Sequence, residues 1–243
     1  MRFLIAPTSR TTGRALERLV KERGATKGEV CYGVRSADGD ALNARAGGSK
    51  LLQLQMLQRA NVPVPPLRLA APSEEDFGLW PVWYARRAQH HGGTDIAVAC
   101  QADEAAWRLQ AGWAYFTARI PIMREVRVWA TAGRLGVHHL GTFSKDMANP
   151  AAFRRTGRNN KNGFAFNVIP KADIPRDAVS ITQRALEALG LDFGATDMVE
   201  DYDGAWRVLE VNTAPGSAPS HDGRARQCVR LLADHITNWS KTL

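Results

Sequence analysis

The sequence predicts an α+β protein that contains at least one antiparallel hairpin. The chain opens with a strand-like run at residues 2–6, a polar turn and a helix at about 14–23, which is the start of an α/β unit. Near the other end, two runs rich in β-branched and aromatic residues flank Asp203-Gly204, a dipeptide typical of tight hairpin turns. Apolar residues at helical spacing predict further helices at 50–60, 175–189 and 222–238.

Length and composition are those of a globular protein. The 243 residues, 44% hydrophobic and 23% charged, can form one large domain or two small ones. No apolar run is long enough to span a membrane, and the apolar start is too short for a signal peptide. Cys31, Cys100 and Cys228 are odd in number and lack the spacing of a metal site. We therefore expect a cytoplasmic protein with reduced thiols and no membrane partner.

The net charge is strongly positive. The chain has 32 Lys and Arg residues against 24 Asp and Glu residues, which gives +8. A surface of this sign attracts anions, such as ATP, an acidic peptide or nucleic acid. The charge does not choose among these partners, and a solvated basic surface is the alternative explanation.

The predicted hairpin brings two carboxylates together. With a two-residue turn at Asp203-Gly204, Glu200 faces Arg207 and Asp197 lies directly opposite Glu210. Two carboxylates opposite one another repel and would weaken the pairing of the strands. The sequence therefore needs either a source of positive charge here or a different register.

Asn212 adds an amide to the same face, because side chains alternate along a strand. A hard divalent cation would remove the repulsion between Asp197 and Glu210. Two carboxylates with an amide oxygen are ligands that Mg²⁺ accepts, with water and phosphate in its other positions. The alternative is an exposed acidic hairpin whose register is slipped by one residue.

Asp197, followed by Glu210 and Asn212 in Leu-Glu-Val-Asn-Thr-Ala-Pro-Gly at 209–216, resembles the metal-binding end of the ATP-grasp superfamily. Its members include D-alanine–D-alanine ligase and the ribosomal-protein glutamyl ligases. The resemblance rests on the 13-residue spacing of Asp197 and Glu210 and on the Pro-Gly that follows, and it covers roughly residues 41–218. It implies two Mg²⁺ ions, with Mn²⁺ as a substitute, that bridge the phosphates of ATP and are held by Asp197, Glu210 and Asn212.

The resemblance assigns further residues to the nucleotide. Lys50 matches a lysine that reaches the phosphates, and an exposed lysine in a first helical turn is the alternative. Arg86 stands where the family usually has lysine at the end of a strand, which leaves the α-phosphate contact open. Two apolar runs flank the loop with His91, Gly92 and Gly93, which predicts a hairpin. Glycines there would let backbone N–H groups cover the triphosphate.

A third group follows the predicted hairpin. Residues 119–123 resemble the family's hinge, whose backbone hydrogen-bonds adenine, and the hinge residues are Arg119, Ile120, Pro121 and Ile122. Glu125 matches an acidic residue of the nucleotide site, and Arg127 on the same strand face matches an arginine that contacts phosphoryl oxygens. An ion pair between these two is the alternative. Arg158, in the basic stretch 141–171, would contact phosphate or acyl substrate, unless that stretch is a solvated or nucleic-acid-binding loop.

The implied ATP-grasp fold has two α/β subdomains whose antiparallel sheets hold ATP between them. An abbreviated α/β unit at residues 1–48 would precede an ATP-grasp domain at 49–243. Within it, about 66–125 would form the subdomain over ATP, and the remainder would bind metal and substrate. Because the first unit is short, the residues that recognise the substrate stay open.

The implied reaction joins a small-molecule or peptide carboxylate to an amine. The carboxylate attacks the γ-phosphate, ADP leaves, and the amine displaces phosphate from the acyl phosphate to form an amide. Positioning and electrostatics would supply the rate, so no nucleophilic side chain is needed. Two alternatives remain: a basic nucleic-acid-associated protein on a degenerate ATP-grasp scaffold, or a ligase whose acceptor is a nucleic acid or an acidic protein tail.

Overall fold

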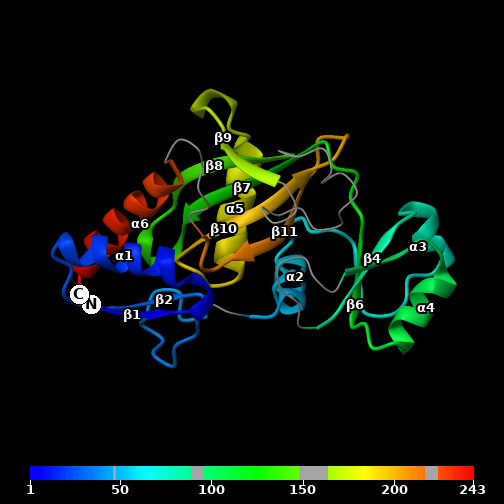
Figure 1. The fold of residues 1–243 in the computed structure, drawn as a ribbon, viewed down its shortest axis with the longest axis horizontal. Helices are drawn as coiled ribbons and strands as arrows, with labels where there is room; N and C mark the ends of the chain where they lie inside the picture. Colours follow the sequence, from blue (N-terminus) through cyan, green and yellow to red (C-terminus); the bar gives the residue numbers. More distant parts are fainter. Residues whose placement is uncertain (46–47, 89–95, 148–163, 217–223) are drawn as a thin grey trace.

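The computed structural model describes residues 1–45, 48–88, 96–147, 164–216 and 224–243. Within these ranges the strands form a two-stranded parallel sheet and two antiparallel sheets of four and five strands (Figure 1). Helices cover the sheets on several sides. This mixture of helices and antiparallel sheets confirms the predicted α+β fold class.

The helices and strands have the following bounds. The helices are α1 (Arg10–Glu22), α2 (Lys50–Arg59), α3 (Glu74–Leu79), α4 (Ala102–Gln110), α5 (Arg176–Ala188) and α6 (Arg224–Ser240). The parallel sheet consists of β1 (Arg2–Ile5) and β2 (Glu29–Tyr32). Across the four-stranded sheet lie β3 (Leu67–Arg68), β6 (Tyr115–Ala118), β4 (Trp83–Arg86) and β5 (Ile96–Ala99). Across the five-stranded sheet lie β11 (Trp206–Asn212), β10 (Phe193–Glu200), β7 (Arg124–Thr131), β8 (His138–Met147) and β9 (Phe164–Val168).

The five-stranded sheet separates two apolar clusters. Val126, Val128 and Met198 pack in one cluster with residues of α5. Trp129 and Phe193 face the other way and pack with residues of α1 and α6. Figure 1 shows this sheet between the N-terminal strands and the four-stranded sheet.

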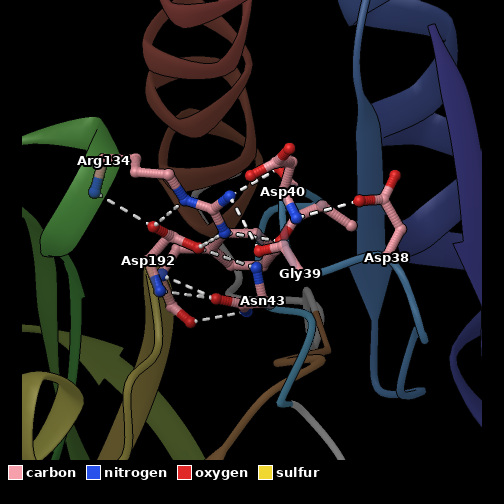
Figure 2. A network of polar contacts seen from close by, with 8 residues as sticks. Asp38, Gly39, Asp40, Asn43, Arg134 and Asp192 are labelled. Atoms are coloured by element: carbon pink, nitrogen blue, oxygen red, sulfur yellow. Dashed lines mark hydrogen bonds and ion pairs between the residues drawn. The ribbon is translucent and has the colours of Figure 1, made fainter.

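A buried polar network ties the N-terminal unit (β1, α1, β2 and the segment up to residue 45) to the five-stranded sheet (Figure 2). The Asp192 carboxylate accepts hydrogen bonds from the backbone N of Asn43 at 2.8 Å and of Arg134 at 3.0 Å. The Arg134 guanidinium pairs with the same carboxylate at 2.8 Å. The Asn43 side chain bonds the backbone N of Asp192 at 2.7 Å and the carbonyl of Phe193 at 2.9 Å. The N-terminal unit therefore shares a core with the sheet, and the predicted domain boundaries stay predictions.

The four-stranded sheet forms a smaller layer with α3 and α4, on the right of Figure 1. Its core contains Phe77, Trp83 and Phe116. Strand β4 pairs antiparallel with β5, with Arg86 opposite Ile96, so the hairpin predicted from the two apolar runs forms. Residues 119–123 connect this sheet to the five-stranded sheet, as a hinge does.

The β10–β11 hairpin has the predicted central pair but a different turn. Asp197 lies opposite Glu210, as predicted. However, Glu200 lies opposite Trp206, so the predicted pairing of Glu200 with Arg207 is wrong. The turn spans residues 201–205 instead of two residues. The register then shifts by one residue between Asp197 and Met198, which marks a bulge. This shift brings Asp197 opposite Glu210, as predicted.

Candidate functional site

Three oxygen-bearing side chains converge in the part of the β10–β11 hairpin that lies away from its turn. Asp197 and Glu210 are cross-strand neighbours. The Asn212 amide lies 3.4 Å from an Asp197 oxygen and 3.3 Å from a Glu210 oxygen. Alternation along β11 puts Glu210 and Asn212 on one face, as predicted from the sequence. The structure therefore brings the three predicted metal ligands together.

Two cations of the chain neutralise these carboxylates. Arg127 from β7 donates to both oxygens of Asp197, at 2.6 and 2.7 Å. Lys50, the first residue of α2, forms an ion pair with Glu210. Ser49 caps that helix by accepting a hydrogen bond from the backbone of residue 52, which fixes the start of α2 beside β11. The positive charge that the hairpin needs thus comes from β7 and α2 in this structure.

The Arg127–Asp197 pair stays charged although it is buried. Burial by itself raises the pKa of Asp197, but the adjacent Arg127 guanidinium outweighs burial and holds this pKa well below its ordinary value. Burial likewise acts to lower the pKa of Arg127, and Asp197 reverses that effect, so the pKa is raised. Asp197 is therefore ionised at neutral pH, as a metal ligand must be.

A second buried ion pair lies beside the first. Lys145 on β8 donates to Glu125 on β7 at 2.6 Å, and the two side chains are 9% and 2% exposed. The ring of Phe166 lies 4.5 Å from the Arg127 guanidinium carbon and 5.7 Å from the Lys145 nitrogen. Glu125 thus pairs with Lys145, and Arg127 pairs with Asp197. Each is held by a partner on a neighbouring strand, and they do not pair with each other.

Lys145 was not among the predicted site residues. It belongs to the basic stretch 141–171, which was expected to be a loop, whereas the structure places it inside the long strand β8. The available signal was spacing: Phe143, two residues earlier, is buried in the core, and alternation puts Lys145 on the same face.

Arg86 reaches the site from the other sheet. Its Nε donates to the hydroxyl of Thr117 on β6 at 2.9 Å. Burial lowers the pKa of Arg86, and the negative charge of Glu210 acts in the opposite direction. Within the described ranges, Arg86 forms no ion pair with a carboxylate. Arg86, a half-buried cation, therefore lies close enough to the hairpin to interact with the charge of Glu210.

The other predicted nucleotide residues lie in the hinge or outside the described residues. The backbone N of Arg119 donates to Val82 at 2.9 Å, and that of Met123 donates to Glu200 at 2.9 Å, so both ends of the hinge are fixed. Ile120 is buried, whereas Pro121 is exposed and Ile122 is half-buried. The remaining site residues, which lie outside the described ranges, are His91, Gly92, Gly93 and Arg158.

The donor set fits a hard cation. The described residues contain no group of three or more His, Cys, Asp or Glu side chains that could hold a metal by themselves. Asp197, Glu210 and Asn212 supply two carboxylates and an amide, which leaves coordination positions for water and phosphate. Mg²⁺ is usually bound in this way, through one or two carboxylates and the phosphates of a substrate.

Comparisons with known proteins identify the fold. No family model and no curated protein matches the chain. Among solved structures, the ATP-grasp ligase PsnB complexed with a minimal precursor has a TM-score of 0.70 and 15% identity, over 98% of both chains. D-alanyl-alanine synthetase A from Vibrio cholerae has a TM-score of 0.67 and 13% identity, over 98% of this chain and 97% of that chain. The Chryseobacterium gregarium RiPP-associated ATP-grasp ligase has a TM-score of 0.51 and 17% identity, over 76% of this chain and 59% of that chain.

The chain therefore has the ATP-grasp fold, which confirms the expectation from the resemblance. PsnB has also been solved with Mg and ADP. None of the described helices is long and apolar enough to cross a membrane.

Proposed function

We propose that the protein is an ATP-dependent ligase that joins a carboxylate to an amine through an acyl phosphate. The observation that carries this proposal is the charged cluster on the ATP-grasp fold. Asp197, Glu210 and Asn212 form a metal-ligand set, and Arg127 and Lys50 already balance its charge. Mg²⁺ bound to these three residues would screen the phosphate oxygens of ATP.

The cations of the chain suit the transfer of a phosphoryl group. A carboxylate oxygen of the substrate attacks the γ-phosphorus, and the bond to the β,γ-bridging oxygen breaks, which releases ADP. Arg127 and Lys145, fixed by their ion pairs and by Phe166, present positive charge to the phosphoryl oxygens. The amine then attacks the acyl carbon, and phosphate leaves.

We assign the remaining predicted residues to the nucleotide. Arg86 takes the place of the family's lysine at the phosphates, because it is half-buried and forms no ion pair with a carboxylate of the described ranges. The residues assigned to adenine, phosphates and their cover are Lys50, Arg86, His91, Gly92, Gly93, Arg119, Ile120, Pro121, Ile122 and Glu125. We propose that Arg158 contacts the phosphate or the acyl substrate. We also propose that Mn²⁺ can replace Mg²⁺.

A peptide is the favoured source of the carboxylate. PsnB was solved with a precursor peptide, and the Chryseobacterium enzyme with a leader and core peptide. The positive net charge of +8 suits an acidic peptide. Three free cysteines suit a reducing compartment such as the cytoplasm.

The test is the release of ADP with Mg²⁺ across a panel of amino acids, amines and short acidic peptides. Wild type is compared with Glu210→Gln, which removes a metal-ligand charge, and with Glu187→Gln, the same change on the exposed side of α5. We expect turnover that needs a substrate pair, falls by about 100-fold or more in Glu210→Gln, and is retained in Glu187→Gln. Tight nucleic-acid binding without any ATP binding would show that the scaffold has another use.

A further inference from the structure

A cavity of about 330 Å³ lies between the N-terminal unit and α2, outside the charged cluster. Its polar lining includes Arg35, Arg45 and Thr213, and its apolar lining includes Leu52, Met56 and Leu191. This volume is in the range of small-ligand sites.

The cavity lies on the opposite side of the sheet edge from the metal-ligand set. Leu191 belongs to the apolar cluster on the α5 face of the sheet, as does Val211. Glu210 and Asn212 flank Val211 and point to the other face. Thr213, the next residue along the chain, lines the cavity. The cavity is nevertheless close to the carboxylates, because Gln53, which lines it, lies one helical turn from Lys50, the partner of Glu210.

The lining suits a carboxylate on a short aliphatic stem. Within the described ranges no Asp or Glu lines the cavity, and neither Arg35 nor Arg45 forms an ion pair. Arginine presents a planar fork that matches a carboxylate. Leu52 and Met56 supply an apolar surface for methylene groups. Among the described residues, no aromatic side chain lines the cavity, so this lining offers no stacking platform for nucleic-acid bases.

Both arginines lie against glycine backbone. A Cβ added to Gly48 would lie 3.4 Å from a nitrogen of Arg35, and one added to Gly190 would lie 3.1 Å from a nitrogen of Arg45. Gly190 follows the C-terminus of α5, whose carbonyls attract a cation. This attraction accounts for the position of Arg45, but it does not account for Arg35, which lies near Gly48.

We propose that Arg35 and Arg45 bind a second, non-reacting carboxylate of the substrate, the side chain of a glutamate or aspartate. The inference rests on the proposed function, because the bound carboxylate anchors the substrate next to Thr213. Another group of the same substrate then reaches the phosphoryl site, which lies about one turn of α2 away. The acidic residue belongs either to a peptide or to a free amino acid.

Binding is tested by fluorescence anisotropy of a fluorescein-labelled hexapeptide with two glutamates, and of its glutamine counterpart. The variants are Arg35→Gln and Arg45→Gln, and the matched control is Arg59→Gln, an exposed arginine at the far end of α2. We expect each cavity variant and the glutamine peptide to bind at least about 10-fold more weakly, since hydrogen bonds to charged groups have this magnitude. The control should bind within about 2-fold of wild type.

Further arms separate the possible outcomes. If free glutamate displaces the labelled hexapeptide, the carboxylate comes from a free amino acid. If only the unlabelled hexapeptide displaces it, the carboxylate comes from a peptide. Leu52→Trp, which narrows the apolar side, should also weaken binding. Equal affinity of wild type and both arginine variants, no saturable peptide binding, or a single-stranded oligonucleotide that binds more tightly through the same arginines would overturn the proposal. ADP binding with Mg²⁺, measured for each variant, reports on the proposed function separately.

Discussion

Replacement of Arg127 by methionine tests the ion pair at the centre of the site. Arg127 donates to both oxygens of Asp197 at 2.6 and 2.7 Å, and the two side chains are 16% and 7% exposed. The variant leaves a buried carboxylate with the Asn212 amide, at 3.4 Å, as a donor. Removal of one partner of a buried pair destabilises by about 3–5 kcal/mol. For a chain of this size, that loss lowers the melting temperature by about 6–20 °C.

The assay is thermal unfolding, with Arg18→Met as the control. Arg18 pairs with Glu22 one turn further along α1, and the two side chains are 73% and 60% exposed. An exposed pair contributes about 0–1 kcal/mol, so the control should lose no more than about 4 °C. Equal melting temperatures for the two variants would refute the argument from burial.

The pH dependence follows from the lowered pKa of Asp197. A carboxyl whose folded pKa lies below its unfolded pKa stabilises the fold above the unfolded value, about 3.9, and loses this contribution as pH falls through the folded value. The gap between wild type and Arg127→Met should be full at pH 7 and smaller near pH 3. About 10 mM MgCl₂ should raise the melting temperature of the variant more than that of wild type, because the metal replaces the lost charge. A gap independent of pH would contradict this account.

Three further predictions concern the rest of the chain. Asp192→Ala removes the acceptor that joins the N-terminal unit to the sheet, and we expect a loss of about 2 kcal/mol with faster hydrogen exchange after β2. Gly190→Ala places a Cβ at φ +62 and should cost about 1–2 kcal/mol by chemical unfolding. Burial raises the pKa of the Cys31 thiol to about 11 and of the Cys228 thiol to about 12, so a disulfide reagent at neutral pH should label exposed Cys100 first.

Each of these predictions has a control. Gly39→Ala, where an added Cβ meets nothing within 4 Å, should leave the free energy of unfolding nearly unchanged. Equal losses of stability in Gly39→Ala and Gly190→Ala would contradict the argument from strain. Glu187→Ala on the exposed side of α5 should leave hydrogen exchange after β2 unchanged, unlike Asp192→Ala. Cys100→Ser should abolish the fast labelling phase, and equal rates for all three thiols would contradict their assigned burial.

The β10–β11 hairpin shows which features the local sequence can predict and which it cannot. The pair of Asp197 and Glu210 was predicted from an assumed two-residue turn, yet the turn spans residues 201–205. The bulge beyond Met198 shifts the register back by one residue, so the pair forms nevertheless. A period-two pattern cannot reveal a bulge, because the extra residue depends on how the strand fits its neighbour.

The partners of the charged residues were not readable from the sequence. The two carboxylates of the hairpin need positive charge nearby, and the sequence of the hairpin alone predicted that a metal ion supplies it. The structure adds Arg127 from β7 and Lys50 from α2. It also pairs Glu125 with Lys145. These contacts join residues far apart in the chain, and their geometry depends on the order of strands in the sheet.

The sequence by itself determined helices α1, α2, α5 and α6, the pairing of the two hairpins and the candidate ligand set, because these depend on turn residues, caps and periodicity within a few residues. The short helix α3 was not predicted. Its resemblance to ATP-grasp proteins also predicted the fold that the structural comparison confirms. Only the tertiary structure decided which cation meets which carboxylate, and that Arg35 and Arg45 share a cavity beside Thr213. The physical reason is that spacing along one element sets which side chains share a face, whereas packing between elements sets which faces meet.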